Sequence, residues 1–377
     1  MQKEKIIQEL EELKNDNRLR TIKTNDKSLY NFSSNDYLGL AHDKDLLQKF
    51  YQNYSFDNYK LSSSSSRLID GSYLTVMRLE KKVEEIYGKP CLVFNSGFDA
   101  NSSVIETFFD KKSLIITDRL NHASIYEGCI NSRAKILRYN HLDVSALEKL
   151  LKKYSKDYDD ILVVTETVYS MDGDCVEIKK ICDLKDEYNF NLMVDEAHSY
   201  GVYGYGIAYN EKLVDKIDFL VIPLGKAGAS VGAYVICDEI YKNYLINKSK
   251  KFIYSTALPP VNNLWNLFVL ENMINFKVKI EKFQELITFS LNTLKKLNLK
   301  TKSTSHIISI IIGDNLNTVN LSNNLKELGY LAYAIKEPTV PKDTARLRIS
   351  LTADMKKEDI ETFFKTLKAE MKKIGVI

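Results

Sequence analysis

The chain has 377 residues, which exceeds the size of about 250–300 residues at which a single hydrophobic core stops growing. We therefore expect one large domain and a smaller one. A hydrophobic content of 44%, a charged content of 27% and a net charge of +3 are ordinary for a globular protein. They give no sign of a nucleic-acid partner or a membrane surface.

The sequence carries no signal of secretion, disulfide bonding or zinc binding. The five cysteines are an odd number, and no two of them have the CxxC spacing of a metal or redox pair. The N-terminal stretch is charged from its third residue, unlike a signal peptide. No segment approaches the roughly 20 apolar residues that span a bilayer. We expect a cytoplasmic protein with reduced thiols, no metal and no membrane contact.

Residues 1–40 are predicted to form an N-terminal arm, with a helix followed by a small strand segment. Ile6, Ile7, Leu10 and Leu13 recur at helical spacing. This pattern predicts an amphipathic arm helix.

Residues 41–275 are predicted to form a large α/β domain. Apolar runs predict buried strands at 91–94, 114–117, 161–166, 191–196 and 219–223, and helical periodicity appears between them, for example at 144–154 and 176–188. This alternation is typical of a mostly parallel sheet covered on both faces. The run at 232–238 follows its predecessor after a short loop, which predicts an antiparallel partner.

Residues 276–377 have a different pattern and are predicted to form a small α+β domain. A long helix is expected at 277–297, strands at 309–314 and 345–352, and helices near 318–328 and 356–373.

Two polar clusters follow the first two strands, where open α/β sheets bind their ligands. Ser96, Gly97 and Phe98 follow the strand at 91–94 and open a helix whose N–H groups could hold a phosphate. An ordinary strand-to-helix turn is the alternative. His122 follows the strand at 114–117 and could stack on an aromatic ring, with a partly buried structural histidine as the alternative.

Two further clusters follow later strands. Asp195 closes an apolar strand, where a desolvated carboxylate requires a cation such as a protonated pyridine nitrogen. A helix N-cap is the alternative. His198 should lie on the same side. Lys226 stands between small residues after the strand at 219–223, where desolvation makes a lysine nucleophilic towards an aldehyde; a solvent-facing loop lysine is the alternative.

The order of these groups is more informative than any one of them. A phosphate turn, a ring-stacking histidine, a partner for a pyridine nitrogen and a lysine for a Schiff base follow successive strands. These are the roles that a pyridoxal 5'-phosphate (PLP) site requires. The sequence therefore predicts a PLP enzyme whose cofactor lysine is Lys226.

From about Asn31 to the C-terminus, the chain resembles the α-oxoamine synthases, a branch of the aspartate-aminotransferase-like, fold type I PLP enzymes. The segments that carry the resemblance are NFSSNDYLGLA, SRLIDGS, FNSGFDAN, DRLNHASI, ETVYSMDGD, VDEAHSYG, LGKAGAS, IYSTALPP and PTVPKDTARLRISLTA. The resemblance implies an α/β fold with a mostly parallel central sheet and a C-terminal α+β domain. It also implies PLP as cofactor and a homodimer with a shared active site.

The resemblance implies a role for each residue around the cofactor ring. Lys226 would hold the cofactor and act as general base. Asp195 would pair with the pyridinium nitrogen, and His122 would stack on the ring. His198 and Ser170 would lie near the ring hydroxyl.

The resemblance also implies contacts to the phosphate and the substrates. The backbone of Ser96, Gly97 and Phe98 would hold the phosphate, and Thr256 would reach the phosphate of the neighbouring subunit. Arg348 would bind the amino-acid carboxylate with help from Asn35, although a surface strand arginine is the alternative. One arginine of the arm, either Arg18 or Arg20, would meet the acyl substrate.

The family joins an amino acid to an acyl thioester, either acyl-CoA or an acyl carrier protein, with loss of CO2. SSRLIDGS, SSNDYLG and TVPKDTARLR resemble the members that join L-alanine to a pimeloyl thioester in biotin biosynthesis. A member that uses glycine and acetyl-CoA, or an inactive homologue that serves as a binding subunit, is the alternative.

Several positions depart from the family pattern. Pro223 stands where the family has a threonine that donates to the phosphate, and Ala227 where it has a glycine. Residues 62–66 are five serines where glycines are usual, and glycines adopt positive φ more readily. The turn SYGVYGYG after His198 is shortened.

Overall fold

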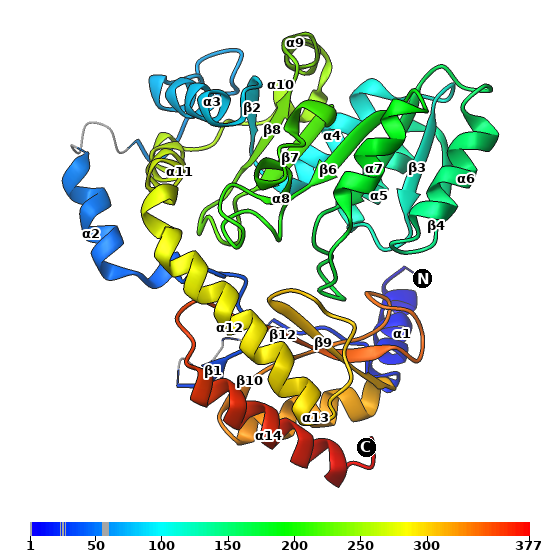
Figure 1. The fold of residues 1–377 in the computed structure, drawn as a ribbon, viewed down its shortest axis with the longest axis vertical. Helices are drawn as coiled ribbons and strands as arrows, with labels where there is room; N and C mark the ends of the chain where they lie inside the picture. The colour runs from blue at the N-terminus through cyan, green and yellow to red at the C-terminus, as the bar shows by residue number, and fades with distance from the viewer. Residues whose placement is uncertain (1, 23, 25, 27, 55–59) are drawn as a thin grey trace. The chain divides into compact units, whose positions relative to one another are not determined.

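The computed structural model describes residues 2–22, 24, 26, 28–54 and 60–377 (Figure 1). Its chain forms two compact units. The large unit comprises Asp36–Tyr169 and Cys175–Glu281, and the small unit comprises Met1–Asn35, Ser170–Asp174 and Lys282–Ile377. The division at residues 40 and 275 into an arm, a large and a small domain stays a prediction.

The large unit is built on a seven-stranded sheet with the order β2-β8-β7-β6-β5-β3-β4. Its strands are β2 (Cys91–Phe94), β3 (Leu114–Asp118), β4 (Lys135–Tyr139), β5 (Ile161–Glu166), β6 (Asn191–Asp195), β7 (Phe219–Pro223) and β8 (Ala233–Cys237). Strands β4, β3, β5, β6 and β7 are parallel, and β8 runs antiparallel to both β7 and β2. The carboxyl ends of every strand except β8 therefore lie at the same edge of the sheet.

Helices of the large unit precede its first strand, occupy the connections between most of its strands and follow its last strand (Figure 1). They are α2 (Lys44–Asn53), α3 (Leu74–Tyr87), α4 (Gly97–Phe108), α5 (Ala123–Ser132), α6 (Val144–Tyr154), α7 (Ile178–Asp183), α8 (Ile207–Asn210), α9 (Glu239–Lys248), α10 (Lys250–Ile253) and α11 (Pro260–Asn272). Side chains cap several of them: Asp43, Ser96 and Asp143 each accept a hydrogen bond from the first turn of α2, α4 and α6.

The core of the large unit is apolar on the strands and on the helices that cover them. Ile115, Val164 and Val221 of the sheet belong to one buried cluster with Val104 of α4 and Ile125 of α5. Because the central strands are buried on both faces, their sequences are continuous apolar runs rather than alternating ones. The core thus fixes the strand ends on which the polar residues stand.

The small unit contains two small sheets. The antiparallel sheet has the order β11 (Tyr333–Ile335), β12 (Ala345–Ser350), β9 (Ile307–Gly313), and β1 (Tyr30–Asn31) pairs in parallel with β10 (Tyr330–Leu331). Its helices are α1 (Gln2–Asn15), α13 (Asn315–Glu327), α14 (Lys357–Lys373) and most of α12 (Lys277–Lys296). Phe32 stacks on Phe363 of α14 at 3.9 Å between ring centroids, which ties the N-terminal segment to this unit.

The predicted fold class is confirmed, with differences at single elements. The helix expected at 176–188 is α7 followed by a separate 3-10 turn, Leu184–Asp186. The sequence analysis did not predict β4, because Lys135 and Arg138 interrupt its apolar pattern, and only Tyr139 in this edge strand is fully buried. Among the described residues, no helix is both long and apolar enough to cross a membrane.

Candidate active site

The four predicted clusters all belong to the large unit and follow strands that end at one edge of the sheet. They stand after β2, β3, β6 and β7. A fifth polar residue, Glu166, ends β5 between β3 and β6 and is the register partner of Asp195. The carboxyl edge of the sheet therefore gathers the candidate site, as its topology requires.

The turn after β2 is built around an N-cap serine. The hydroxyl of Ser96 accepts a hydrogen bond from the N–H of Asp99 at 3.0 Å and donates one to its carboxylate at 2.8 Å. Gly97 and Phe98 are the first helical residues of α4, so their N–H groups have no acceptor within the helix. A Cβ at Gly97 would lie 2.6 Å from Cγ of Pro223, so this turn rests directly against the end of β7.

His122 is the N-cap of α5, and its backbone is held from β5. Its N–H donates to Oε1 of Glu166 at 2.6 Å, and its Nδ1 lies 2.8 Å from the hydroxyl of Ser124. The residue as a whole is exposed, whereas its contacts with Glu166 and Ser124 are partly buried. Desolvation nevertheless lowers the pKa of His122; Asp195 raises this pKa and Lys226 lowers it.

Asp195 is buried at the end of β6, with 3% of its surface exposed. Its carboxylate accepts a hydrogen bond from Nδ2 of Asn101 at 2.6 Å and one from the N–H of Ala197 at 2.7 Å. The same Nδ2 donates to Ser124 at 3.0 Å, so hydrogen bonds connect Asp195 to His122 through Asn101 and Ser124. No helix begins after Asp195, so the N-cap alternative is wrong.

His198 lies in the turn after β6 and is also buried. Its Nδ1 is 2.7 Å from the hydroxyl of Tyr37. The turn continues to Gly201, where a Cβ would lie 2.4 Å from Cβ of Ala227. The segment that carries His198 therefore packs against the residue beside Lys226.

Lys226 follows β7 and is half-buried, between exposed Gly225 and buried Ala227. Its charge lowers the pKa of both His122 and Glu166, which places these three groups within electrostatic reach of one another. The pKa of Glu166 is raised well above its usual value, chiefly because the group is buried and next because Asp195 repels a second negative charge. The Lys226 ammonium thus lies within electrostatic reach of the His122 imidazole and the buried Glu166 carboxyl group.

These residues fit PLP. The buried Asp195 carboxylate is held by neutral N–H donors, which leaves its charge available to a cation. The Ser96–Phe98 turn offers backbone N–H groups, and at Gly97 there is no room for a side chain. Lys226 supplies the amine. Within the part of the chain that the structure describes, no cluster of His, Cys, Asp and Glu could hold a metal ion.

The departures from the family pattern have a local explanation. The N–H of Glu196 donates to the carbonyl of Val221, and in a regular parallel ladder the N–H of residue 223 would then donate to the carbonyl of Glu196. Proline at position 223 has no N–H to donate. The carbonyl of Glu196 instead accepts from Ser199 and Tyr200, so a proline is tolerated at the end of a central strand. Ser64 adopts a positive φ of 54° although it is not glycine.

Three predicted substrate and ring contacts come together in the small unit. Arg348 of β12 donates from Nε to the carbonyl of Ser170 at 2.6 Å and from a terminal nitrogen to Oδ1 of Asn35 at 3.2 Å. The same nitrogen donates to the hydroxyl of Ser350 at 2.7 Å. Only 7% of Arg348 is exposed, so the alternative of a surface arginine is wrong.

Of the remaining predicted residues, Arg20 and Thr256 are exposed and Arg18 is half-buried. Arg20 donates to the hydroxyl of Thr339 at 2.9 Å, and Arg18 lies 3.7 Å from the carboxylate of Asp16. Thr256 of the large unit is exposed and forms a bridge with Ser66, and its carbonyl accepts a hydrogen bond from Nδ2 of Asn95 at 2.7 Å. Their proposed roles are taken up below.

The sequence analysis missed three residues of this site: Asn101, Glu166 and Tyr37. Glu166 ends an apolar strand, as the predicted residues do, and this signal could have found it. Asn101 lies in the second turn of α4, and its contact with Asp195 depends on tertiary packing. Tyr37 lies in the NFSSNDYLGLA segment, without a local sign of its partner.

Comparisons with known proteins identify the family. The family model "Aminotransferase class I and II" matches residues 27–367. A protein of Pasteurella multocida named "Putative 8-amino-7-oxononanoate synthase" is 40% identical over 354 residues, which cover 92% of each chain. A structure of SPT with PLP internal aldimine superposes with a TM-score of 0.88 at 25% identity and covers 99% of this chain and 98% of its own.

A structure of 8-amino-7-oxononanoate synthase from Francisella tularensis gives a TM-score of 0.78 at 28% identity, over 93% of this chain and 99% of its own. The fold and the strand-end site together define a fold type I enzyme with PLP as its cofactor. The chain belongs to the aminotransferase class I and II family and, within it, to the α-oxoamine synthases.

Proposed function

We propose that the protein joins L-alanine to a pimeloyl thioester and releases 8-amino-7-oxononanoate, CO2 and free CoA or carrier thiol, as a step in biotin biosynthesis. The observation that carries this proposal is the 40% identity, over 92% of both chains, to the Pasteurella multocida protein of that name. The free thiols of all five cysteines support a cytoplasmic location.

When bound, PLP supplies an electron sink for the negative charge that develops on Cα of the amino acid. We propose that Asp195 holds the proton on the ring nitrogen that makes this sink effective. Its two N–H donors, on Asn101 and Ala197, fix the carboxylate without neutralising it. His198, held by Tyr37, is proposed to donate to the ring hydroxyl, together with Ser170.

Lys226 is proposed to have two duties. Its Nζ holds the cofactor before the substrate arrives, and afterwards it removes the proton from Cα and returns one to the product. His122 is proposed to cover one face of the ring and so to fix the ring plane. Burial of Asp195 and His198 keeps water from competing for the groups that they hold.

We propose that the backbone N–H groups of Gly97 and Phe98, with Ser96, hold the phosphate at the N-terminus of α4. Pro223 has neither a hydroxyl nor an N–H, so this turn must hold the phosphate without a donor from the end of β7. Thr256 is proposed to contribute to the phosphate site of a second copy of the chain. This role implies a homodimer.

Arg348 is proposed to bind the amino-acid carboxylate. Its guanidinium is buried and is held by three neutral oxygens, those of Ser170, Asn35 and Ser350. A planar guanidinium pairs with a carboxylate through two parallel hydrogen bonds, which fixes the orientation of the substrate. The half-buried Arg18 or the exposed Arg20 is proposed to meet the acyl substrate.

Purified protein loaded with PLP and supplied with L-alanine and pimeloyl-CoA tests this function by mass spectrometry of the product. We expect 8-amino-7-oxononanoate, and no product from Lys226→Ala. Parallel reactions pair glycine with acetyl-CoA, L-serine with palmitoyl-CoA and L-alanine with pimeloyl carrier protein. Product from glycine and acetyl-CoA alone would overturn the biotin assignment, and no product from any pair would support an inactive binding subunit.

A further inference from the structure

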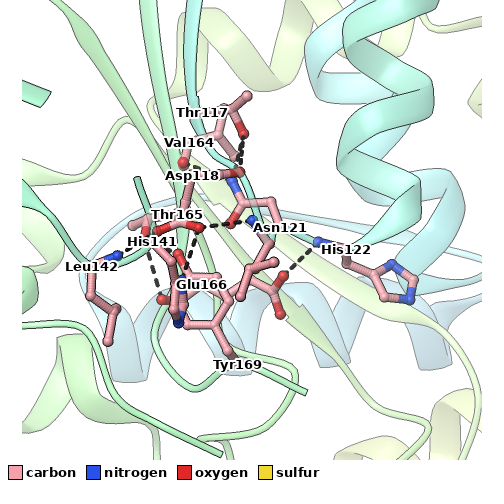
Figure 2. A network of polar contacts seen from close by, with 11 residues as sticks. Thr117, Asp118, Asn121, His122, His141, Leu142, Val164, Thr165, Glu166 and Tyr169 are labelled. Carbon is pink, nitrogen blue, oxygen red and sulfur yellow. Dashed lines mark hydrogen bonds and ion pairs between the residues drawn. The ribbon is translucent and has the colours of Figure 1, made fainter. Parts of the chain in front are cut away.

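Asp118 ends β3, and its carboxylate is fully buried although it does not belong to the cofactor contacts described above. Oδ1 accepts hydrogen bonds from the N–H of Leu120 at 2.8 Å and from Nδ1 of His141 at 2.9 Å, and Oδ2 accepts one from the N–H of Leu142 at 2.9 Å. Because a carboxylate only accepts, Nδ1 of His141 carries the proton in this contact. Figure 2 shows this network.

The turn from Arg119 to His122 has an acceptor for each of its backbone N–H groups. Arg119 donates to the carbonyl of Tyr139, Leu120 and Asn121 donate to Asp118, and His122 donates to Glu166. The side chain of Asn121 adds bonds from its Nδ2 to Thr117 at 2.7 Å and to the carbonyl of Val164 at 2.8 Å. This turn places His122, so its geometry sets where the imidazole stands (Figure 2).

The same carboxylate also holds the loop that carries His141. Leu142 adopts a positive φ of 58°. This conformation is unfavourable for a residue other than glycine. The N–H of Leu142 donates to Oδ2 of Asp118, as described above. Asp118 therefore couples the loop after β4 to the turn after β3, and His141 supplies a hydrogen bond to this buried carboxylate.

His141 contacts the segment after β5 as well. Its ring lies edge-on against that of Tyr169, with 4.4 Å between centroids and 86° between planes. The Tyr169 hydroxyl is 2.9 Å from Oγ1 of Thr165, next to Glu166. His141 thus touches both segments from which His122 receives its backbone support.

We propose that Asp118 and His141 form a positioning pair that fixes the ring of His122 over the cofactor. Neither residue touches the reacting atoms. The inference rests on the proposed stacking of His122 on the cofactor ring. It assigns a positioning role to a hydrogen-bonded pair that would otherwise serve only to join two loops.

Two substitutions of His141 separate the hydrogen bond from the packing. The amide nitrogen of Asn can occupy the place of imidazole Nδ1, whereas that of Gln reaches the place of Nε2. H141N should therefore keep the bond to Asp118, and H141Q should lose it. His42, which is exposed, provides the control variant H42Q.

The readouts are hydrogen exchange of the 118–123 segment in the apoprotein, the visible circular dichroism of the bound cofactor, and kcat with KM. H141Q should speed exchange, change the dichroism and lower kcat by about 10- to 100-fold with little change in KM, since a shift of about 1 Å costs that much. H141N and H42Q should resemble the wild type. Asp118→Asn, which removes one acceptor oxygen, should behave like H141Q.

Wild-type exchange and dichroism in both H141Q and Asp118→Asn would overturn the inference, as would equal damage in H141N and H141Q. His122→Asn distinguishes this failure from that of the proposed site. If His122→Asn leaves the dichroism unchanged, the proposed stacking is wrong. If it changes the dichroism but H141Q does not, the positioning pair is wrong.

Discussion

Glu166 and Asp195 end neighbouring parallel strands and stand directly opposite each other in register, both buried. Two carboxyl groups so placed cannot both ionise at low cost, because each raises the energy of the other's charge. The structure resolves the conflict through their partners. Asp195 is bonded by Asn101 and Ala197, whereas the pKa of Glu166 is raised well above its usual value, chiefly by burial.

The first prediction concerns Glu166. Because its protonated form is favoured, Glu166→Gln should keep the acceptor for the N–H of His122 and retain cofactor binding. Glu166→Leu should leave that N–H buried and unpaired, which costs about 1–3 kcal/mol. Urea unfolding of the two variants measures the difference. Equal damage in both would show that the negative charge, not the acceptor, is needed.

The second prediction concerns Asn101. Its hydrogen bond to Asp195 is to a charged acceptor. Such bonds contribute about 1.5–3 kcal/mol. Asn101→Ala should therefore weaken PLP binding by about 10- to 100-fold, measured by equilibrium titration of the apoprotein. Asn247→Ala, at an exposed asparagine of α9 that donates to Asn243, is the matched control. Unchanged affinity in Asn101→Ala would contradict the proposed role of Asp195.

The third prediction compares two arginines of β12 that are separated by Leu347. Arg346 pairs with Asp172 at 2.6 Å, and Arg348 donates to oxygens of Ser170, Asn35 and Ser350. Arg348→Lys should raise the KM for the amino acid by about 10- to 100-fold, since it loses the paired hydrogen bonds to a carboxylate, and leave the KM for the thioester unchanged. Arg346→Lys should lower stability without this selective effect. If both variants shift the same KM, Arg348 has no special role.

The fourth prediction concerns pH. Burial raises the pKa of Glu196 from 4.5 to about 8, so between these values the folded protein holds a proton that the unfolded chain has lost. The contribution of this group to stability is therefore present at low pH and falls as pH rises through that window, by up to about 1.4 kcal/mol per unit. Glu196→Gln cannot ionise and should remove this fall.

Urea unfolding at pH 5, 6.5 and 8 checks this expectation. The stability of Glu196→Gln relative to the wild type should rise steadily across the series, by a few kcal/mol in total. Glu11→Gln, at an exposed glutamate of α1, should follow the wild type. Parallel curves for the wild type and Glu196→Gln would show that Glu196 is already ionised in the folded protein.

Local sequence patterns predicted every strand of the large sheet except β4, and most of the candidate site. Continuous apolar runs marked β2, β3, β5, β6 and β7, and polar residues stand at or within a few residues of the end of each run. The pairing of β1 with β10 joins segments separated by most of the chain, and no local pattern signals it. The support of Asp195 by Asn101 and of Arg348 by Asn35 depends on tertiary packing for the same reason.

Reduction of the PLP-loaded protein with borohydride, followed by peptide mapping, tests the central claim most directly. The reagent fixes the cofactor to the amine that holds it. We predict that the cofactor is found on the peptide that contains Lys226 and is absent from that peptide in Lys226→Ala. Cofactor fixed to a different lysine in the wild-type protein, or none fixed at all, would contradict the account.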